Sequence, residues 1–218
     1  MLAYIIRRLL QSILVLIAVG FIAFSLFNFV GDPINNMVGV EATDAERDAV
    51  RERLGLDDPF PVQFARFAGN AVQGDFGQSY RLSIPVETAI AERLPATLEL
   101  VFVAAVMALV IGVPLGVYTG LHRDGAISRV LLTVSLIGIS LPTFLIGILL
   151  ILVFSVWLGW LPSFGRGATV NLWGWETNLA SWEGFKSIIL PAVTLCLFQL
   201  TLLMRLVRAE MLEVLRTD

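Results

Sequence analysis

Residues 100–121 read LVFVAAVMALVIGVPLGVYTGL and carry no charged side chain. The hydrocarbon core of a bilayer is about 30 Å thick, so a helix needs about 20 apolar residues to cross it. Three further stretches are equally free of charge, namely residues 9–30, 130–160 and 187–204. The sequence therefore predicts an all-α integral membrane protein, a polytopic helix bundle with four transmembrane helices in this chain.

The composition supports a membrane protein and narrows its chemistry. Of the 218 residues, 57% are hydrophobic and 15% are charged, whereas soluble domains carry about 25% charged residues. The formal net charge of −3 gives no reason to expect nucleic-acid binding. Cys196 is the only cysteine and His122 the only histidine, which excludes an internal disulfide, a cysteine-rich metal site and a histidine-based zinc site. We therefore expect no cofactor and no metal in this chain.

The apolar stretches define one transmembrane domain, residues 1–218. We place the spans at residues 9–30, 97–121, 130–157 and 187–208, with an outer segment 31–95, an outer loop 158–186 and a tail 209–218. The third span ends at Trp157 because tryptophans favour the membrane interface. The first stretch could instead be a secretory signal flanked by Arg7 and Arg8, but it exceeds the usual apolar length of about 7–15 residues. No small-residue cleavage site follows it, so we prefer a retained helix.

Arginine placement predicts which ends of the spans face the cytoplasm. With the N-terminus inside, seven arginines fall on the inner side: Arg7, Arg8, Arg123, Arg129, Arg205, Arg208 and Arg216. The outer loop carries only Arg166 and Lys186 as basic residues. This difference agrees with the positive-inside rule for short loops. We therefore predict a multi-pass membrane protein with a cytoplasmic N-terminus.

The outer segment, residues 31–95, is predicted to be helical rather than a loose linker. Thr43 and Glu46 have the spacing of a capping box, and Gly55 is a natural helix end. A second amphipathic helix is predicted in PFPVQFARFAGNAVQG, before Gly74. Its predicted apolar face consists of Val62, Phe64, Phe67, Ala68 and Val72. The helices either cover the bundle or offer a docking surface to an external partner, and we expect both because an exposed apolar face needs cover.

Motifs of several enzyme classes are absent. The phosphate-binding loop G-x-x-x-x-G-K-[ST] needs a glycine before its lysine, but the only lysine, Lys186, follows Phe185. There is no H-E-x-x-H, and GISLP at residues 138–142 is not the G-x-S-x-G of a serine nucleophile. His122 lies in LHRDG, a turn between spans. We therefore predict that this chain carries no catalytic residues and is not an enzyme.

A few polar side chains lie in or beside the predicted spans and are candidates for a substrate pathway. Gln199 lies in the middle of the fourth span, Ser140 precedes Pro142 in the third, and Glu99 stands at the outer end of the second. Polar groups in a bilayer tend to face the bundle interior. Structural alternatives stay open: Gln199 as a helix–helix hydrogen bond, Ser140 as support for a proline kink, and Glu99 as a group at headgroup depth.

Small residues in the second span predict how that helix packs. Gly112 and Gly116 are four residues apart, which is a signal of close approach between helices. We expect ordinary helix contact at these glycines, without a functional role.

Seven stretches occur together and in order along the chain. They are AYIIRRLLQSILVL (3–16), GDP (31–33), GDFGQSY (74–80), PVETAIAERLPATLEL (85–100), LGWLPSFG (158–165), LPAVTL (190–195) and RLVRAEMLEVLRTD (205–218). In this combination the chain resembles the inner-membrane permease subunits of ATP-driven (ABC) importers, in the dipeptide, oligopeptide and nickel group. The resemblance covers the chain from residue 3 to residue 218, and no single stretch carries it alone.

The resemblance implies six spans and a short cytoplasmic coupling helix after the fourth, just beyond the final residues EVLRTD. We therefore expect the chain to be C-terminally truncated relative to such permeases. Four charged residues are expected on the ATPase-coupling side: Arg205, Arg208, Glu210 and Glu213. The alternative, from the residues alone, is a basic membrane stop whose glutamates lie on a helix surface.

The partners implied by the resemblance are a second homologous permease subunit, two ATPase subunits, an extracytoplasmic substrate-binding protein and membrane lipid. The resemblance implies a transport subunit in a bacterial or archaeal inner membrane. The implied function is import of peptides or similar small solutes by alternating access, with ATP hydrolysed on the partner subunits. The alternatives are a stand-alone secondary carrier or channel, and a non-transporting scaffold subunit. A secondary carrier usually has a buried carboxylate, or a helix break with an ion site, at mid-membrane. Here the only acidic residue near a span is Glu99, at the edge of the second. The substrate stays open among peptides, glutathione, nickel chelates, opines and sugars.

Overall fold

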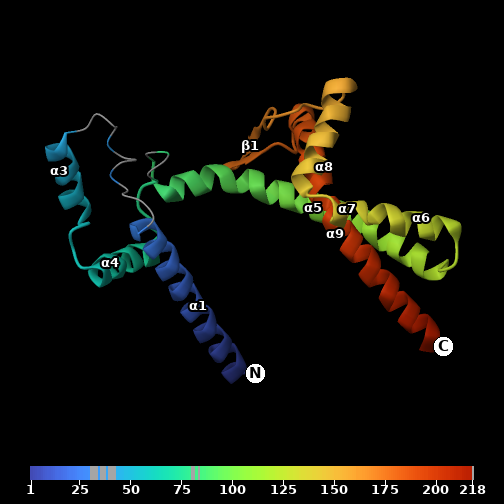
Figure 1. Ribbon diagram of the computed structural model, residues 1–218, viewed down its shortest axis with the longest axis horizontal. Helices are drawn as coiled ribbons and strands as arrows, with labels where there is room; N and C mark the ends of the chain where they lie inside the picture. The colour runs from blue at the N-terminus through green and yellow to red at the C-terminus, as the bar shows by residue number, and fades with distance from the viewer. Residues whose placement is uncertain (30–33, 35–37, 39–42, 80–81, 83, 218) are drawn as a thin grey trace. The chain divides into compact units, whose positions relative to one another are not determined.

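The computed structural model describes residues 1–218 except 30–33, 35–37, 39–42, 80–81, 83 and 218. The chain divides into two compact units, residues 1–92 and 93–218, and each is described by itself. Both units are built mainly of helices, and a short hairpin forms the one sheet found among the described residues (Figure 1).

The first unit contains α1 (Leu2–Phe29), α3 (Asp44–Leu54) and α4 (Phe60–Val72). At the start of α3, the Thr43 hydroxyl accepts from the Glu46 backbone N–H, and the Thr43 backbone N–H donates to the Glu46 carboxylate at 2.9 Å. The Thr43 backbone N–H, and after it the Thr43 hydroxyl, hold the pKa of the Glu46 carboxyl below its ordinary value. Gly55 ends α3 with a φ of +63°, which favours glycine. The predicted capping box and glycine stop are confirmed.

An aromatic stripe joins α4 to α1 within the first unit. Phe60, Phe64 and Phe67 of α4 contact the rings of Phe21 and Phe24, with ring centroids 5.2–5.7 Å apart. Aromatic pairs at such distances add to the stabilisation from burial alone. The predicted helix therefore covers part of α1, as one of the two predicted roles requires.

The predicted apolar face of α4 is partly wrong. Val62 is 47% exposed and Val72 is 89% exposed, and Phe60 belongs to the contacting face instead. The reason is helical geometry: residues three, four and seven apart share a face. Phe60, Phe64 and Phe67 have this spacing, whereas Val62 lies two positions from Phe60 and points elsewhere.

The second unit contains most of α5 (Val86–Leu121) and all of the elements that follow it. These are α6 (Ala126–Ser135), α7 (Ile137–Ser140), α8 (Thr143–Leu150), the π-helix η1 (Ile151–Trp157), β1 (Val170–Leu172), β2 (Trp175–Thr177) and α9 (Trp182–Thr217). The helices α6, α7 and α8 all pack against α9, which makes α9 the central helix of this unit.

Four candidate membrane spans occur in the described residues. The helices α1, α5 and α9 are each long and apolar enough to cross a bilayer. The fourth candidate is a pair of segments, Ala126–Ser140 and Thr143–Trp157, bent by 107° at a short break. Counted as one span, this pair brings the total to the four that the sequence predicts.

The third span is broken rather than a single kinked helix over residues 130–157. Pro142 has φ −57° and ψ 136°, which is extended backbone, and it caps the start of α8. Proline removes one helical hydrogen bond and disfavours helical backbone at the residue before it. The sequence predicts a kink at this proline, and the structure shows a full interruption.

The helix α9 is longer than its predicted span. It contains 36 residues, which at 1.5 Å per residue gives about 54 Å, against about 30 Å for the hydrocarbon core. It starts at Trp182 in the outer loop and continues into the tail (Figure 1). One continuous helix therefore connects the two ends of the second unit.

Candidate functional site: an outer polar network and an inner basic groove

The outer loop between η1 and α9 contains a tight hairpin. The strands β1 and β2 pair antiparallel, and the turn between them is formed by Trp173 and Gly174. Both turn residues have positive φ, +53° and +87°, as in a type I′ turn. The Asn171 side chain accepts from the Gly174 backbone N–H at 2.9 Å. With only three residues in each strand, the hairpin needs other contacts to hold it in place.

Glu99 on α5 provides the main contact to this hairpin. It is 6% exposed. Its Oε1 accepts from the Trp175 Nε1–H at 3.0 Å, and its Oε2 accepts from the Asn178 backbone N–H at 3.1 Å. A buried carboxylate is unfavourable unless it is hydrogen-bonded, and hydrogen bonds to a charged acceptor are strong ones. The pair of bonds therefore anchors the loop to α5.

Arg166, also in the outer loop, connects the hairpin region to the start of α9. Its Nη2 donates to Asn178 Oδ1 at 3.0 Å, and Asn178 Nδ2 donates to the Arg166 carbonyl at 3.0 Å. The Ser187 hydroxyl of α9 donates to the same carbonyl at 2.7 Å. We name Glu99, Arg166, Trp175, Asn178 and Ser187 the outer network. Among the residues that the structure describes, no buried side-chain nitrogen or oxygen of this network lacks a partner.

Glycines bring α5 and α9 into close contact along a seam. The facing pairs are Gly112 with Leu203, Gly116 with Val207, and Gly120 with Met211. A Cβ added at Gly116 would lie 2.7 Å from the Val207 Cβ, closer than two such atoms can approach. The close packing predicted from Gly112 and Gly116 is confirmed.

A buried hydrogen bond fixes the first half of the broken span on α9. Thr201 is 1% exposed, and its hydroxyl donates to the Ser135 carbonyl at 2.7 Å. Gly138 lies against the same part of α9, because a Cβ added there would come 2.7 Å from the Leu197 carbonyl oxygen. The half that precedes Pro142 is therefore held by α9 directly.

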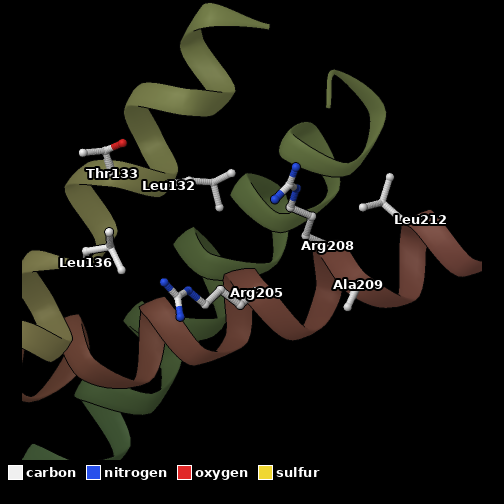
Figure 2. A pocket seen from close by; sticks show the side chains of 7 residues that line it. All are labelled: Leu132, Thr133, Leu136, Arg205, Arg208, Ala209 and Leu212. Carbon is white, nitrogen blue, oxygen red and sulfur yellow. The ribbon is translucent and has the colours of Figure 1, made fainter. Parts of the chain in front are cut away.

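A groove of about 430 Å³ opens between the C-terminal part of α6, with the residue that follows it, and the last turns of α9 (Figure 2). Its lining consists of Leu132, Thr133, Leu136, Arg205, Arg208, Ala209 and Leu212, and we name it the inner groove. Arg208 reaches α5, where its Nε donates to the Thr119 carbonyl at 3.3 Å. Within the part of the chain that the structure describes, no carboxylate forms an ion pair with Arg205 or Arg208. The groove thus carries two positive charges that no carboxylate among the described residues neutralises by an ion pair.

The structure places the three predicted pathway residues in different surroundings. Glu99 is buried in the outer network, whereas Gln199 on α9 and Ser140 at the end of α7 are exposed. No hydrogen bond joins any two of the three in the described ranges. Their assignment to a pathway stays a prediction.

The four predicted coupling residues lie on the last turns of α9. Arg205, Glu210 and Glu213 are exposed, and Arg208 is half-buried against α5. The two arginines line the inner groove and the two glutamates do not. Their coupling role also stays a prediction, but the geometry separates the two pairs.

Sequence reasoning does not single out Trp175 or Asn178. The hairpin has a short local signal, since NLWGWET places apolar and β-branched residues on either side of a glycine. Nothing in the spacing indicates that Glu99, 76 positions before Trp175, is the residue that holds it.

Known proteins are similar to this chain along its whole length. Residues 1–101 match the N-terminal membrane component of binding-protein-dependent transport systems, and residues 112–218 match the family described as binding-protein-dependent transport system inner membrane component. A dipeptide transport system permease protein of Alkalihalophilus pseudofirmus is 33% identical over the whole chain, which covers 69% of that relative. An oligopeptide transport system permease protein of Bacillus subtilis is 38% identical, with 68% of it covered. A glutathione transport system permease protein of Escherichia coli is 37% identical, with 66% of it covered.

These matches include the segments that build both ends of the second unit. The outer network extends from Glu99 to Ser187, and the inner groove extends from Leu132 to Leu212. The chain spans about two thirds of the length of these relatives. With its several apolar helices, the chain is a multi-pass membrane protein and belongs to the family of inner membrane components of binding-protein-dependent transport systems.

Proposed function

We propose that this chain is the permease subunit of an ATP-driven importer that moves peptides or similar small solutes across the inner membrane by alternating access. The observation that carries the proposal is the agreement among the relatives. Permeases named for dipeptides, oligopeptides and glutathione match the whole chain at 33–38% identity. All three named substrates are short peptides, which favours the same class of solute here.

Two ATPase subunits supply the energy, a second homologous permease completes the pathway, and an extracytoplasmic binding protein delivers the solute. The continuity of α9 supports this division of labour. Glu210 and Glu213 lie near its inner end, and Ser187 lies in the outer network. Because α9 is one helix of 36 residues, a displacement that an ATPase imposes on its inner end reaches the outer loop.

We propose Gln199 as the first candidate for a residue that lines the solute pathway. It lies on α9 next to Phe198, between Leu195 and Leu202, and these apolar neighbours are 39–48% exposed. A polar side chain on an otherwise apolar and exposed helix face within a span is costly in lipid. A face that turns toward a second permease and a solute pathway removes this cost.

Ser140 gives weaker support to the same assignment. It ends α7 immediately before the break at Pro142, and non-helical backbone at membrane depth is tolerated where protein or a water-filled cavity receives it. Broken helices also form the sites of secondary carriers, so this feature favours the alternative of a stand-alone carrier equally well. The experiment below separates the two.

We also propose the orientation of the chain in the membrane. The N-terminus and the inner groove lie on the cytoplasmic side, and the hairpin lies outside. The supporting observation is the sequence itself, which places seven arginines on one side and only Arg166 and Lys186 in the loop on the other. Labelling of a cysteine introduced at exposed Trp173 by a membrane-impermeant maleimide tests it, because only an outside hairpin is labelled in intact cells.

Uptake of a labelled dipeptide into proteoliposomes tests the function. The protein is reconstituted with the second permease, the ATPase subunits and the binding protein of its system, and each is omitted in turn. We expect uptake only with ATP and all partners. Uptake that continues without any ATPase identifies a secondary carrier or channel. Loss of the partners' activity without any change in substrate choice identifies a scaffold subunit.

A paired substitution tests the pathway. Gln199→Leu removes the amide at similar side-chain size, and we expect it to raise the KM for solute several-fold without changing ATP hydrolysis in the absence of solute. Gln11→Leu is the matched control, since Gln11 is also an exposed amide on an apolar helix. Equal effects of the two substitutions contradict a pathway role for Gln199.

A further inference from the structure

The two arginines of the inner groove lie where the apolar part of α9 ends. Residues 187–204 carry no charge, Arg205 follows directly, and Arg208 is about one turn further on. Since the apolar stretch matches the hydrocarbon core, the first charged turn after it falls at the level of the lipid headgroups. Both guanidinium groups are therefore placed where phosphate groups of lipids are concentrated.

The groove combines these charges with an apolar wall. Leu132 and Leu136 come from α6 and the residue after it, Leu212 comes from α9, and all three line the groove beside the arginines. Figure 2 shows the side chains of Arg205 and Leu132 on the same side of α9, with Leu132 projecting from the neighbouring helix. A ligand that fits this lining has an anionic group and an apolar part next to it.

We propose that the inner groove binds an anionic phospholipid, with the phosphodiester on Arg205 and Arg208 and an acyl chain against Leu132 and Leu136. A guanidinium group donates two parallel hydrogen bonds to a phosphate. Arg208 uses Nε for the Thr119 carbonyl, and its two Nη groups remain for the headgroup. Basic pockets between membrane helices are suited to anionic headgroups.

Charge and shape together favour a lipid over the other possible occupants. Free phosphate can bind the two arginines, but it has no apolar part that contacts the leucines. An acidic segment of a partner protein satisfies the charge, but it has to enter at headgroup depth, where lipid is the abundant anion. The proposal requires no transport activity, so it stands or falls independently of the proposed function.

Native mass spectrometry of the protein in detergent tests the proposal, with phosphatidylglycerol and phosphatidylcholine of the same acyl chains as probes. An arginine near an anionic lipid surface contributes about a fivefold gain in affinity. We therefore expect Arg205→Gln with Arg208→Gln to weaken phosphatidylglycerol binding about 25-fold and to leave phosphatidylcholine binding unchanged. Equal binding of the two lipids by the parent protein overturns the proposal.

The matched control removes two charges from the same side of the second unit. Arg123 and Arg129 lie in the turn before α6 and at its start, both exposed and outside the groove lining. Arg123→Gln with Arg129→Gln should leave the preference for phosphatidylglycerol within about twofold. A loss equal to that of the groove variant means that net charge alone attracts the lipid, and the groove is then not a site.

Four further measurements address misfolding of the double variant and the other possible occupants of the groove. Arg205→Gln alone, at an exposed residue for which the structure describes no hydrogen bond, should still weaken binding about fivefold. Inorganic phosphate at millimolar concentration should not displace the lipid, and displacement identifies a general anion site. In the assembled transporter, retained phosphatidylglycerol supports the proposal. A cysteine at Ala209 that cross-links to a protein partner, with no lipid present, overturns it.

Discussion

The outer network and the inner groove lie at opposite ends of α9. They differ in whether their charged side chains find partners within the chain. In the network, Glu99 and Arg166 are surrounded by donors and acceptors of the chain itself. In the groove, Arg205 and Arg208 have no carboxylate partner within the described residues. A charge whose hydrogen bonds are already made stabilises the fold, whereas a charge with free hydrogen-bonding capacity is available to a ligand.

The two regions are connected by the same pair of helices. The seam of Gly112, Gly116 and Gly120 holds α5 against α9 between them. Glu99 precedes the seam glycines on α5. The Thr119 carbonyl, which accepts the hydrogen bond from Arg208, lies at the other end of the seam, next to Gly120. The comparison therefore concerns two ends of one pair of contacting helices, and substitutions at each end test whether their roles differ.

The largest expected effect is that of Glu99→Gln. The substitution removes the negative charge, and the N–H₂ group of the new amide cannot accept a hydrogen bond from Trp175 or Asn178. The two hydrogen bonds to Glu99 are therefore weakened or lost. We expect a loss of about 3 kcal/mol in the local stability of the hairpin. Hydrogen–deuterium exchange of the Asn178 amide should accelerate about a hundredfold.

Glu176→Gln is the control for this substitution. Glu176 lies in the same hairpin, its side chain is 59% exposed, and it approaches Arg166 at 4.0 Å. An exposed ion pair contributes little, so exchange at Asn178 should change less than about threefold. If both substitutions accelerate exchange equally, the hairpin responds to its own charge balance and Glu99 is not its anchor.

The seam gives the second largest effect. Gly116→Ala places a Cβ 2.7 Å from that of Val207, which forces the two helices apart and costs about 1–3 kcal/mol of unfolding free energy. Gly147→Ala on α8 is the matched control, because its Cβ meets only ordinary contacts at 3.7 Å from Thr194. Unfolding in mixed micelles measures both, and equal stability of the two variants contradicts a tight seam.

Local features of the fold could be predicted from the sequence because their signals lie within a few residues. The cap at Thr43, the stop at Gly55 and the close approach at Gly112 and Gly116 all follow from short spacings. The break at Pro142 is only partly predictable. Proline fixes where the helix is disturbed, but the packing of both halves on α9 decides how far it bends.

The candidate site was harder to predict, for a physical reason. The sequence shows that Glu99 is an acid at the edge of a span, which fits a pathway, an interface or an anchor equally well. Its partner, Trp175, lies 76 positions away, and only tertiary structure brings the two together. Arg205 and Arg208 are predictable as inner-side charges, but the groove also needs Leu132, from a different helix.

A smaller effect is expected from Trp175→Phe. The substitution keeps an aromatic ring and removes the Nε1–H that donates to Glu99 at 3.0 Å. One hydrogen bond to a charged acceptor is worth about 1.5 kcal/mol, so exchange at Asn178 should accelerate about tenfold. Trp173→Phe is the control, since Trp173 is fully exposed at the turn and should change nothing measurable. An unchanged rate in Trp175→Phe means that the Trp175 bond does not anchor the hairpin.

The smallest effect on stability is expected at the inner groove, and it decides whether the comparison holds. Arg205→Gln removes an exposed charge without a described hydrogen bond, and substitutions of this kind usually change the unfolding free energy by less than about 0.5 kcal/mol. Arg208→Gln should cost more, about 1 kcal/mol, because it weakens the bond to the Thr119 carbonyl. Unfolding in lipid-free micelles measures both. If Arg205→Gln destabilises the protein as much as Trp175→Phe does, Arg205 has a partner within the fold, and the inner groove resembles the outer network instead of contrasting with it.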